Sequence, residues 1–145
     1  QGQLTAEGVK QAETLAQQMA QRPIDAFVSS DLKRAIDTCS IIALPHNAEV
    51  LTTPLLRERD WGSFTGCFIP DLKDVPWPDD IETMEAMKQR ASLFLDFIRT
   101  HYAGQTVLAV GHGIINKAIQ SVFYDKPTNQ IVPMKNAEVR CLELT

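Results

Sequence analysis

Two short stretches place side chains that suit an anionic group where a strand pattern gives way to a helical one. In VLAVGHG, four apolar residues run into a histidine, His112, that stands between two glycines. In FVSSDLKRA, an arginine, Arg34, follows a similar apolar run. A guanidinium matches the geometry of phosphate oxygens, and an imidazole exchanges protons near neutral pH. Both junctions therefore suggest phosphate binding, although a turn histidine bonded to backbone and a solvated arginine are the ordinary alternatives.

A third stretch, LLRERDWGSFTG, carries a carboxylate between two arginines, in the order Arg57, Glu58 and Arg59. A carboxyl group near a bound phosphate ester suits the role of general acid toward the leaving oxygen. The alternative for this stretch is an exposed charged loop. No Asp, Glu, His or Cys spacing in the sequence matches a metal site, so we expect no metal.

The elements that must position these residues alternate between helices and strands. Helical spacing of apolar residues predicts four helices, with Thr5 as the cap of the first, over residues 4–22, 31–44, 81–102 and 114–123. Short apolar runs and one alternating stretch predict strands over residues 24–28, 48–53, Val107–Val110 and 137–144. Strands separated by helices favour an α/β fold, a three-layer α/β/α sandwich with a mostly parallel sheet. We expect the last strand to lie at an edge, antiparallel, or beside the centre.

In an open sheet of this kind the carboxyl ends of the strands form the binding crevice. His112 lies at such an end, where Gly111 permits a sharp turn and Gly113 permits close backbone approach. The helix that follows would direct free N–H groups toward an anion. At the other junction we expect Ser30 or Asp31 to cap the helix, with Arg34 in its first turn.

Bulk properties exclude several classes of protein. The 145 residues have a net charge of −4 and no run rich in Lys or Arg, which argues against nucleic acid as a partner. No apolar run is long enough to span a membrane, and no signal-peptide pattern opens the sequence. The three cysteines are scattered, which favours a reducing, cytoplasmic location over a disulfide framework.

Taken together, SSDLKRAIDT, LRERDWGSFTG and VLAVGHG resemble three motifs of the histidine phosphatase superfamily, which includes the cofactor-dependent phosphoglycerate mutases. LTAEGVKQAETLA is similar to the first helix of that family, and NAEVRCLEL to its terminal strand. The resemblance covers nearly the whole chain in the right order. It implies a phosphoglycerate mutase-like fold, with Arg34, His112 and Gly113 as phosphate-binding residues and Glu58 as the proton donor. We expect Arg59 and Trp61 to contact the substrate, although the tryptophan is equally suited to pack its loop onto the core.

One feature of the family has no counterpart in the sequence. The family's nucleophile is a histidine in an Arg-His-Gly motif after its first strand, and no such motif occurs here. His46 and His101 lie in no motif, and we interpret both as surface residues. The expectation is a single domain over residues 1–145 that lacks the first strand and the nucleophile loop, with the nucleophile supplied by residues outside this range.

The resemblance implies phosphoryl transfer without metal or other cofactor, through a phosphohistidine, on a small phosphorylated metabolite. Residues 63–81 are shorter than the insertion that the family's mutases usually carry, which favours a phosphatase over a cofactor-dependent phosphoglycerate mutase. A domain that binds phosphorylated ligands without catalysis is the alternative from another class. Pairing of terminal strands is compatible with a homodimer.

Overall fold

The centre of the protein is a parallel β-sheet. The computed structural model describes residues 4–60, 81–132, 134 and 138–144. Within these residues, three strands form the sheet in the order β2-β1-β3. Their bounds are Ala26–Ser30 for β1, Val50–Thr53 for β2 and Val107–Val110 for β3. Phe27 of β1 stands opposite Val50 of β2 and Leu108 of β3, and both pairings are parallel.

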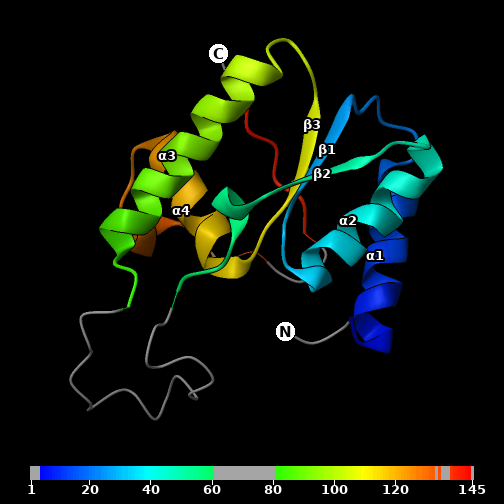
Figure 1. Ribbon diagram of the computed structural model, residues 1–145, viewed down its shortest axis with the longest axis horizontal. Coiled ribbons are helices and arrows are strands. Elements are labelled where there is room, and N and C mark those ends of the chain that lie inside the picture. Colours follow the sequence, from blue (N-terminus) through cyan, green and yellow to red (C-terminus); the bar gives the residue numbers. More distant parts are fainter. Residues whose placement is uncertain (1–3, 61–80, 133, 135–137, 145) are drawn as a thin grey trace.

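Helices cover both faces of this sheet (Figure 1). The helices are α1 (Ala6–Met19), α2 (Lys33–Ala43), α3 (Met84–His101) and α4 (Gly113–Tyr124). Short 3₁₀ turns follow or precede them, namely η1 (Leu44–His46), η2 (Pro54–Leu56) and η5 (Thr128–Gln130). The pair α1 and α2 lies on one face and the pair α3 and α4 on the other, which confirms the three-layer α/β prediction.

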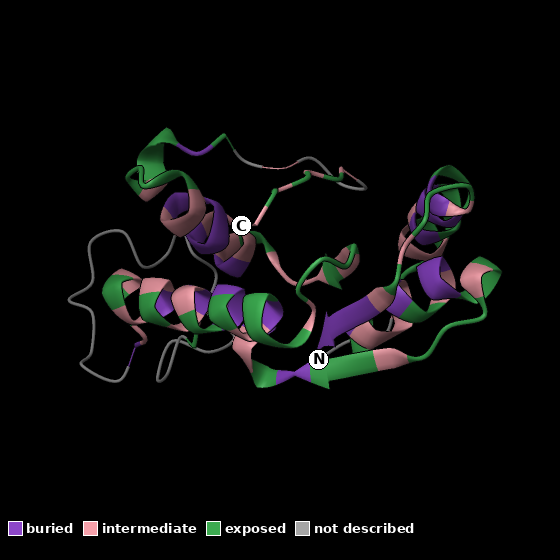
Figure 2. Ribbon diagram, turned by 90° about the horizontal axis from the view of Figure 1, so that it is seen from above, coloured by how far each residue is buried: buried purple, intermediate pink, exposed green. Residues whose placement is uncertain are grey.

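Neighbouring residues of β1 supply the two halves of the core, because successive side chains of a strand point to opposite faces. Phe27 packs with apolar residues of α1 and α2, including Leu15 and Cys39. Val28 packs with those of α3 and α4, including Phe94 and Ile115. Figure 2 shows buried stretches along the helices interrupted by intermediate and exposed ones.

The strand order explains why a site can form between β1 and β3. The chain leaves β1 toward β2 through α2 and then crosses back to β3 through α3. Right-handed crossovers in opposite directions put α2 and α3 on opposite faces of the sheet. The loops after β1 and β3 therefore diverge, and open α/β sheets bind ligands where they do so.

Local signals account for most element bounds. Thr5 caps α1 by accepting a hydrogen bond from Gly8 N at 3.0 Å, as predicted. Thr83 caps α3 in the same way, through Ala86 N, so that helix begins at Met84 and not at residue 81. Strand β1 lies two residues later than predicted, because the polar pair Ser29 and Ser30 continues the ladder as fully buried residues.

The prediction of a terminal strand over 137–144 is wrong for the residues that the structure describes. Residues 138–144 are irregular, although their exposure alternates as a strand's would. Leu142 and Leu144 pack against the core between α3 and α4. Alternating apolar residues indicate which side is buried, whereas a strand also needs a hydrogen-bonded neighbour, and residues 138–144 pair with none of the three described strands.

Candidate functional site

The two junctions that the sequence singled out meet at the carboxyl ends of β1 and β3. Ser29 stands opposite Val110 in the ladder, so the residues that follow each strand leave the sheet side by side. His112 Nε2 lies 3.0 Å from Ser30 Oγ, across 82 residues of sequence. The structure thus brings the histidine junction and the arginine junction together, as predicted.

Ser30 has a different role from the one predicted for it. Leu32 occupies the cap position of α2 and no side chain caps that helix, so the prediction of a Ser30 or Asp31 cap is wrong. Ser30 Oγ instead accepts a hydrogen bond from Leu32 N at 3.3 Å and contacts His112. The hydroxyl can donate its hydrogen to His112 Nε2 when that nitrogen is unprotonated, or accept from it when it carries a proton, because the oxygen has a second lone pair besides the one that Leu32 N uses.

Asp31 is held by an arginine from the neighbouring loop. Its two carboxylate oxygens accept hydrogen bonds from Nε and an Nη atom of Arg57, both at 2.7 Å. This bidentate pair lowers the pKa of Asp31 and ties the start of α2 to the loop after β2. The loop that carries Glu58 is therefore fixed next to the arginine junction.

Arg34 lies in the first turn of α2, as predicted, and is exposed. Its guanidinium makes no hydrogen bond and no ion pair with any residue among 4–60, 81–132, 134 and 138–144. Its charge is nevertheless close enough to His112 to contribute to the shift in that histidine's pKa. Arg34 therefore brings an unneutralised positive charge close to the carboxyl ends of the strands.

The imidazole of His112 is partly buried, and burial is the main cause that lowers its pKa below the usual 6.5. The negative charge of Glu58 opposes this shift, the positive charge of Arg34 adds to it, and Asp31 opposes it. A lowered pKa favours the neutral imidazole near pH 7 in the protein without ligand. A phosphate dianion next to the ring would favour its protonated form.

Glu58 occupies the N-terminus of α4, where the sequence suggested a bound anion. Its Oε1 accepts hydrogen bonds from Ile114 N at 3.0 Å and Ile115 N at 3.1 Å, and Ile114 N also lies 3.2 Å from Oε2. The main-chain N–H of Arg59 donates to the same Oε1 at 3.1 Å. The chain's own carboxylate thus meets the positive end of the helix dipole, one turn from His112.

The two glycines around His112 differ from expectation. A Cβ atom on Gly111 would lie 2.6 Å from Asn116 Oδ1, so this position accepts no side chain without movement. A Cβ on Gly113 would come no nearer than 3.8 Å to Glu58 Oε2. The tight packing is therefore at Gly111, while Gly113 is exposed beside the Glu58 carboxylate.

The predicted substrate contacts Arg59 and Trp61 have different outcomes. Arg59 Nε donates to the main-chain oxygen of Glu82 at 2.7 Å, which joins the loop after β2 to the start of α3. Trp61 lies outside the residues that the structure describes.

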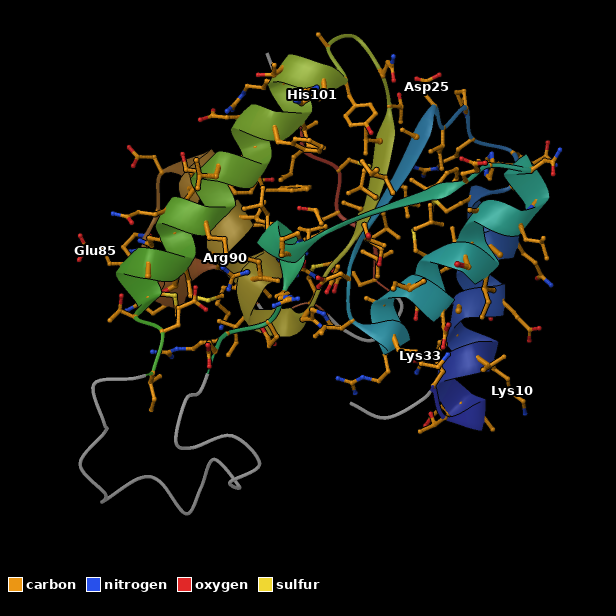
Figure 3. All side chains as sticks on the ribbon, in the orientation of Figure 1. Lys10, Asp25, Lys33, Glu85, Arg90 and His101 are labelled. Carbon is orange, nitrogen blue, oxygen red and sulfur yellow. The ribbon has the colours of Figure 1, made fainter. Side chains whose placement is uncertain are left out.

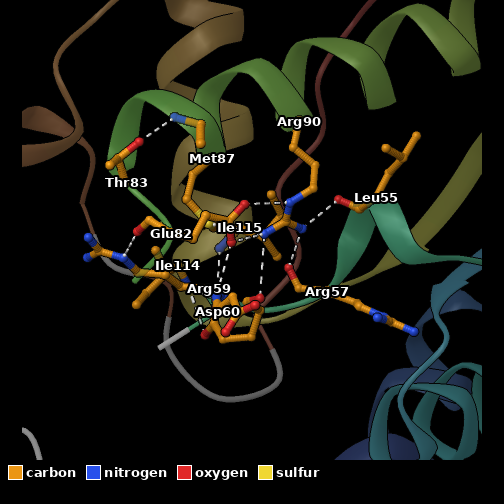
Figure 4. Close-up of polar contacts among 12 residues, drawn as sticks. Leu55, Arg57, Arg59, Asp60, Glu82, Thr83, Met87, Arg90, Ile114 and Ile115 are labelled. Carbon is orange, nitrogen blue, oxygen red and sulfur yellow. Dashed lines mark hydrogen bonds and ion pairs between the residues drawn. The ribbon is translucent and has the colours of Figure 1, made fainter. Parts of the chain in front are cut away.

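Sequence reasoning missed Arg90 of α3. Its guanidinium donates to main-chain oxygens of the segment that leads to Glu58 and to the carboxylate of Glu82 (Figure 4). A signal was present, because Arg90 lies one turn after the buried Met87 and one turn before the buried Phe94, on the helix's apolar side. A cation in such a stripe has to find acceptors inside the protein.

Three further residues that could in principle act as nucleophiles, His46, His101 and Cys39, are not part of this group of side chains. His46 follows α2, at the end where the chain returns to the start of β2, and its Nε2 lies 2.9 Å from Met19 O. His101 ends α3, far from Lys33 at the start of α2 in Figure 3. Cys39 is fully buried, and burial raises the pKa of its thiol to about 12, so it stays protonated.

No group of three or more His, Cys, Asp or Glu side chains among the described residues is arranged to hold a metal ion. None of the described helices has the length and apolar character needed to cross a membrane.

Comparison with known proteins identifies a family whose members the chain resembles. A family model described as "Histidine phosphatase superfamily (branch 1)" matches residues 2–145. Among curated proteins, the chain is 32% identical over 141 residues to a metal-independent phosphoserine phosphatase of Arabidopsis thaliana, covering 82% of this chain and 59% of that protein. It is 28% identical over 131 residues to phosphoserine phosphatase 1 of Hydrogenobacter thermophilus, covering 80% of this chain and 62% of that protein.

The fold agrees with a solved structure as well. The structure of Bacillus stearothermophilus YhfR matches with a TM-score of 0.84 at 23% identity, over 92% of this chain and 74% of that one. The chain spans about three fifths of the length of the two curated relatives, at 59% and 62%. The family model nevertheless spans residues 2–145, a range that contains the two strand–helix junctions and the Glu58 loop. The chain therefore belongs to the histidine phosphatase superfamily.

Proposed function

We propose that the protein is a phosphatase that hydrolyses phosphate monoesters of small metabolites, without a metal, through a phosphohistidine intermediate. Family membership and the phosphoserine phosphatases among the relatives support this reaction class. Phosphoserine is accordingly the first substrate to test.

The observation that carries the proposal is the set of groups at the carboxyl ends of β1 and β3. Arg34 brings a positive charge without a polar partner among the described residues, and His112 lies beside it on Ser30. Glu58 stands at the start of the same helix that follows His112. Two groups suited to bind a phosphate thus adjoin one carboxyl group suited to move a proton.

In the first step, a nucleophilic histidine forms a P–N bond while the ester P–O bond breaks. Arg34, His112 and the main chain at Gly113 bind the phosphoryl oxygens and stabilise the charge of the transition state. The Glu58 carboxyl gives its proton to the leaving alkoxide and becomes a carboxylate. In the second step, that carboxylate takes a proton from water, the water oxygen attacks phosphorus, and the P–N bond breaks to release inorganic phosphate.

We propose that residues 1–145 form one domain and that the nucleophilic histidine is supplied by residues outside this range. His112 has a binding role in this scheme, His46 ends η1 just before β2, and His101 is the last residue of α3. Arg59 and Trp61 are proposed as substrate contacts at the mouth of the site.

A cytoplasmic location is also proposed. Cys39 and Cys141 are both free thiols, which suits a reducing compartment.

The test uses the whole protein with phosphoserine and 4-nitrophenyl phosphate in the presence of a chelator. We expect release of inorganic phosphate and an acid-labile phosphoryl group that mass spectrometry locates on a histidine outside residues 1–145. Transfer to a second alcohol in place of water would indicate a mutase. Binding of phosphate esters with neither labelling nor turnover would contradict the enzyme and indicate a binding domain.

A further inference from the structure

Arg90 contacts several main-chain oxygens of the chain before and at Glu58. One Nη atom donates to Leu55 O at 3.1 Å and to Arg57 O at 2.6 Å, and the other lies 3.5 Å from Glu58 O. Leu55 lies in η2, and Arg57 and Glu58 belong to the segment without helix or strand that follows it, so no β-ladder fixes any of these three carbonyl groups. One guanidinium thus spans the main chain on both sides of Arg57 (Figure 4).

Glu82 completes this arrangement from the other side. Its carboxylate accepts from Arg90 Nε at 3.0 Å and from an Nη atom at 2.8 Å. It also accepts from Asp60 N at 3.0 Å, while Glu82 N donates to Asp60 O at 2.7 Å. Arg90 therefore fixes the chain before Glu58, and Glu82 fixes the chain after it.

The chemistry of the pair suits positioning more than charge balance at the surface. Both side chains are only 17% exposed, so the ion pair is largely withdrawn from water. A guanidinium has five N–H donors in one plane and serves several acceptors at once, which an ammonium group on a flexible stem does not do with the same geometry. Leaving either charge without its partner in such a place is costly.

We propose that Arg90, paired with Glu82, is a positioning residue for Glu58: it sets where the Glu58 carboxyl lies against the start of α4 and the leaving oxygen. The inference rests on the proposed function for its catalytic part, because it concerns the general acid of that reaction. Among the described residues, the hydrogen bonds of the Arg90 guanidinium are all with main chain, Glu82 and the Met87 sulfur, and in this proposal it does not bind the phosphate. An error of about 1 Å in the placement of a catalytic group is enough for a loss on the order of 100-fold.

The test compares Arg90→Met with Arg99→Met in the whole protein. Methionine keeps much of the side chain's bulk and removes every donor. Arg99 is the matched control, because it lies on the same helix, is 39% exposed, and pairs only weakly with exposed Asp96 at 3.4 Å. Glu82→Gln is a second variant, which keeps the shape of the acceptor and removes its charge.

The first measurement does not depend on activity. Amide hydrogen exchange at Ile114 and Ile115 reports whether the Glu58 carboxylate still accepts their N–H groups. We expect exchange at both amides to become about tenfold faster or more in Arg90→Met, less so in Glu82→Gln, and to stay unchanged in Arg99→Met. Unchanged exchange in a folded Arg90→Met protein would overturn the proposal whatever the enzyme does.

The second measurement is the rate of phosphoenzyme formation with two substrates. Phosphoserine has a poor leaving group that needs the acid, whereas 4-nitrophenolate leaves without much help. We expect Arg90→Met to slow the phosphoserine reaction about 10- to 100-fold and the 4-nitrophenyl reaction about threefold, with KM nearly unchanged. Equal losses for both substrates would mean a general structural role and would overturn the positioning role. Failure of the wild-type protein to form any phosphoenzyme would contradict the proposed function and leave the exchange result to decide on Arg90.

Discussion

The cationic side of the site, made of Arg34 and His112, is built differently from its acidic side, made of Glu58 and the Arg90–Glu82 pair. On the acidic side every charge has a partner, since backbone N–H groups hold the Glu58 carboxylate and Arg90 holds its loop. On the cationic side Arg34 is exposed and His112 rests on a neutral hydroxyl. The cationic side thus keeps its charge for a ligand, whereas the acidic side already has the geometry that the reaction needs.

Removal of either cationic-side group should have the largest effect on activity. We expect His112→Ala and Arg34→Ala each to lower kcat/KM by about 1,000-fold, because each removes a group that would bind the phosphoryl oxygens in the transition state. Steady-state kinetics with phosphoserine, or with the best substrate found, measures the loss.

Lys33→Ala is the matched control for Arg34. Lys33 is the neighbouring cation in the first turn of α2, and its exposed pair with Asp37, at 3.2 Å, contributes little. A change of less than about twofold is expected for this variant. Similar losses for Lys33→Ala and Arg34→Ala would mean that only the overall charge of the helix matters.

Glu58→Gln sharpens the comparison, because it should alter chemistry and not phosphate binding. We expect phosphoenzyme formation to slow about 100-fold with phosphoserine and about tenfold or less with 4-nitrophenyl phosphate. Rapid-quench measurement of labelled protein gives both rates. Identical losses with the two substrates would show that Glu58 does not protonate the leaving group.

Ser30→Ala tests the support beneath His112. Loss of one hydrogen bond between neutral groups should lower kcat about fivefold, through a less fixed imidazole. Ser29→Ala is the control, since Ser29 is equally buried but its Oγ donates to Ser30 O at 2.8 Å and makes no contact with His112. Equal effects on kcat after correction for thermal stability would place the role of Ser30 in folding alone.

The smallest expected effect is on stability as a function of pH. The unfolded chain protonates His112 near the ordinary pKa of 6.5, whereas burial lowers the pKa of the folded state. As the pH falls below about 6.5, the unfolded state takes up a proton on His112 before the folded state does. The free energy of unfolding is therefore unaffected by His112 above about pH 6.5 and decreases as the pH falls toward the folded pKa.

Chemical denaturation without phosphate, at about pH 7.5 and about pH 5.5, measures this effect. The free energy of unfolding should fall more between these values in the wild-type protein than in His112→Gln. Equal falls in the two proteins would contradict the lowered pKa.

The residues on the cationic side were predictable from sequence because their signals are local. A strand pattern that runs into a helix pattern identified Arg34 and His112, and the bounds of β3 were predicted correctly. Parallel pairing of the two short apolar strands then brings both junctions to the same end of the sheet, so no long-range contact had to be predicted.

The supporting contacts were not predictable in the same way. Ser30 meets His112 across 82 residues, and Arg90 reaches Arg57 O across 33. Such contacts depend on how α3 packs beside the loop after β2, which no local pattern encodes. For the same reason the alternation over residues 138–144 predicted burial correctly and hydrogen bonding wrongly.

Calorimetric titration of the whole protein with inorganic phosphate tests most directly that one side binds and the other side moves the proton. We expect the wild-type protein to bind phosphate, Arg34→Ala and His112→Ala to bind it about 10- to 100-fold more weakly, and Glu58→Gln to bind it at least as well as the wild type. Equal affinity in all four proteins, or a loss confined to Glu58→Gln, would contradict the division of the site into a binding side and an acidic side.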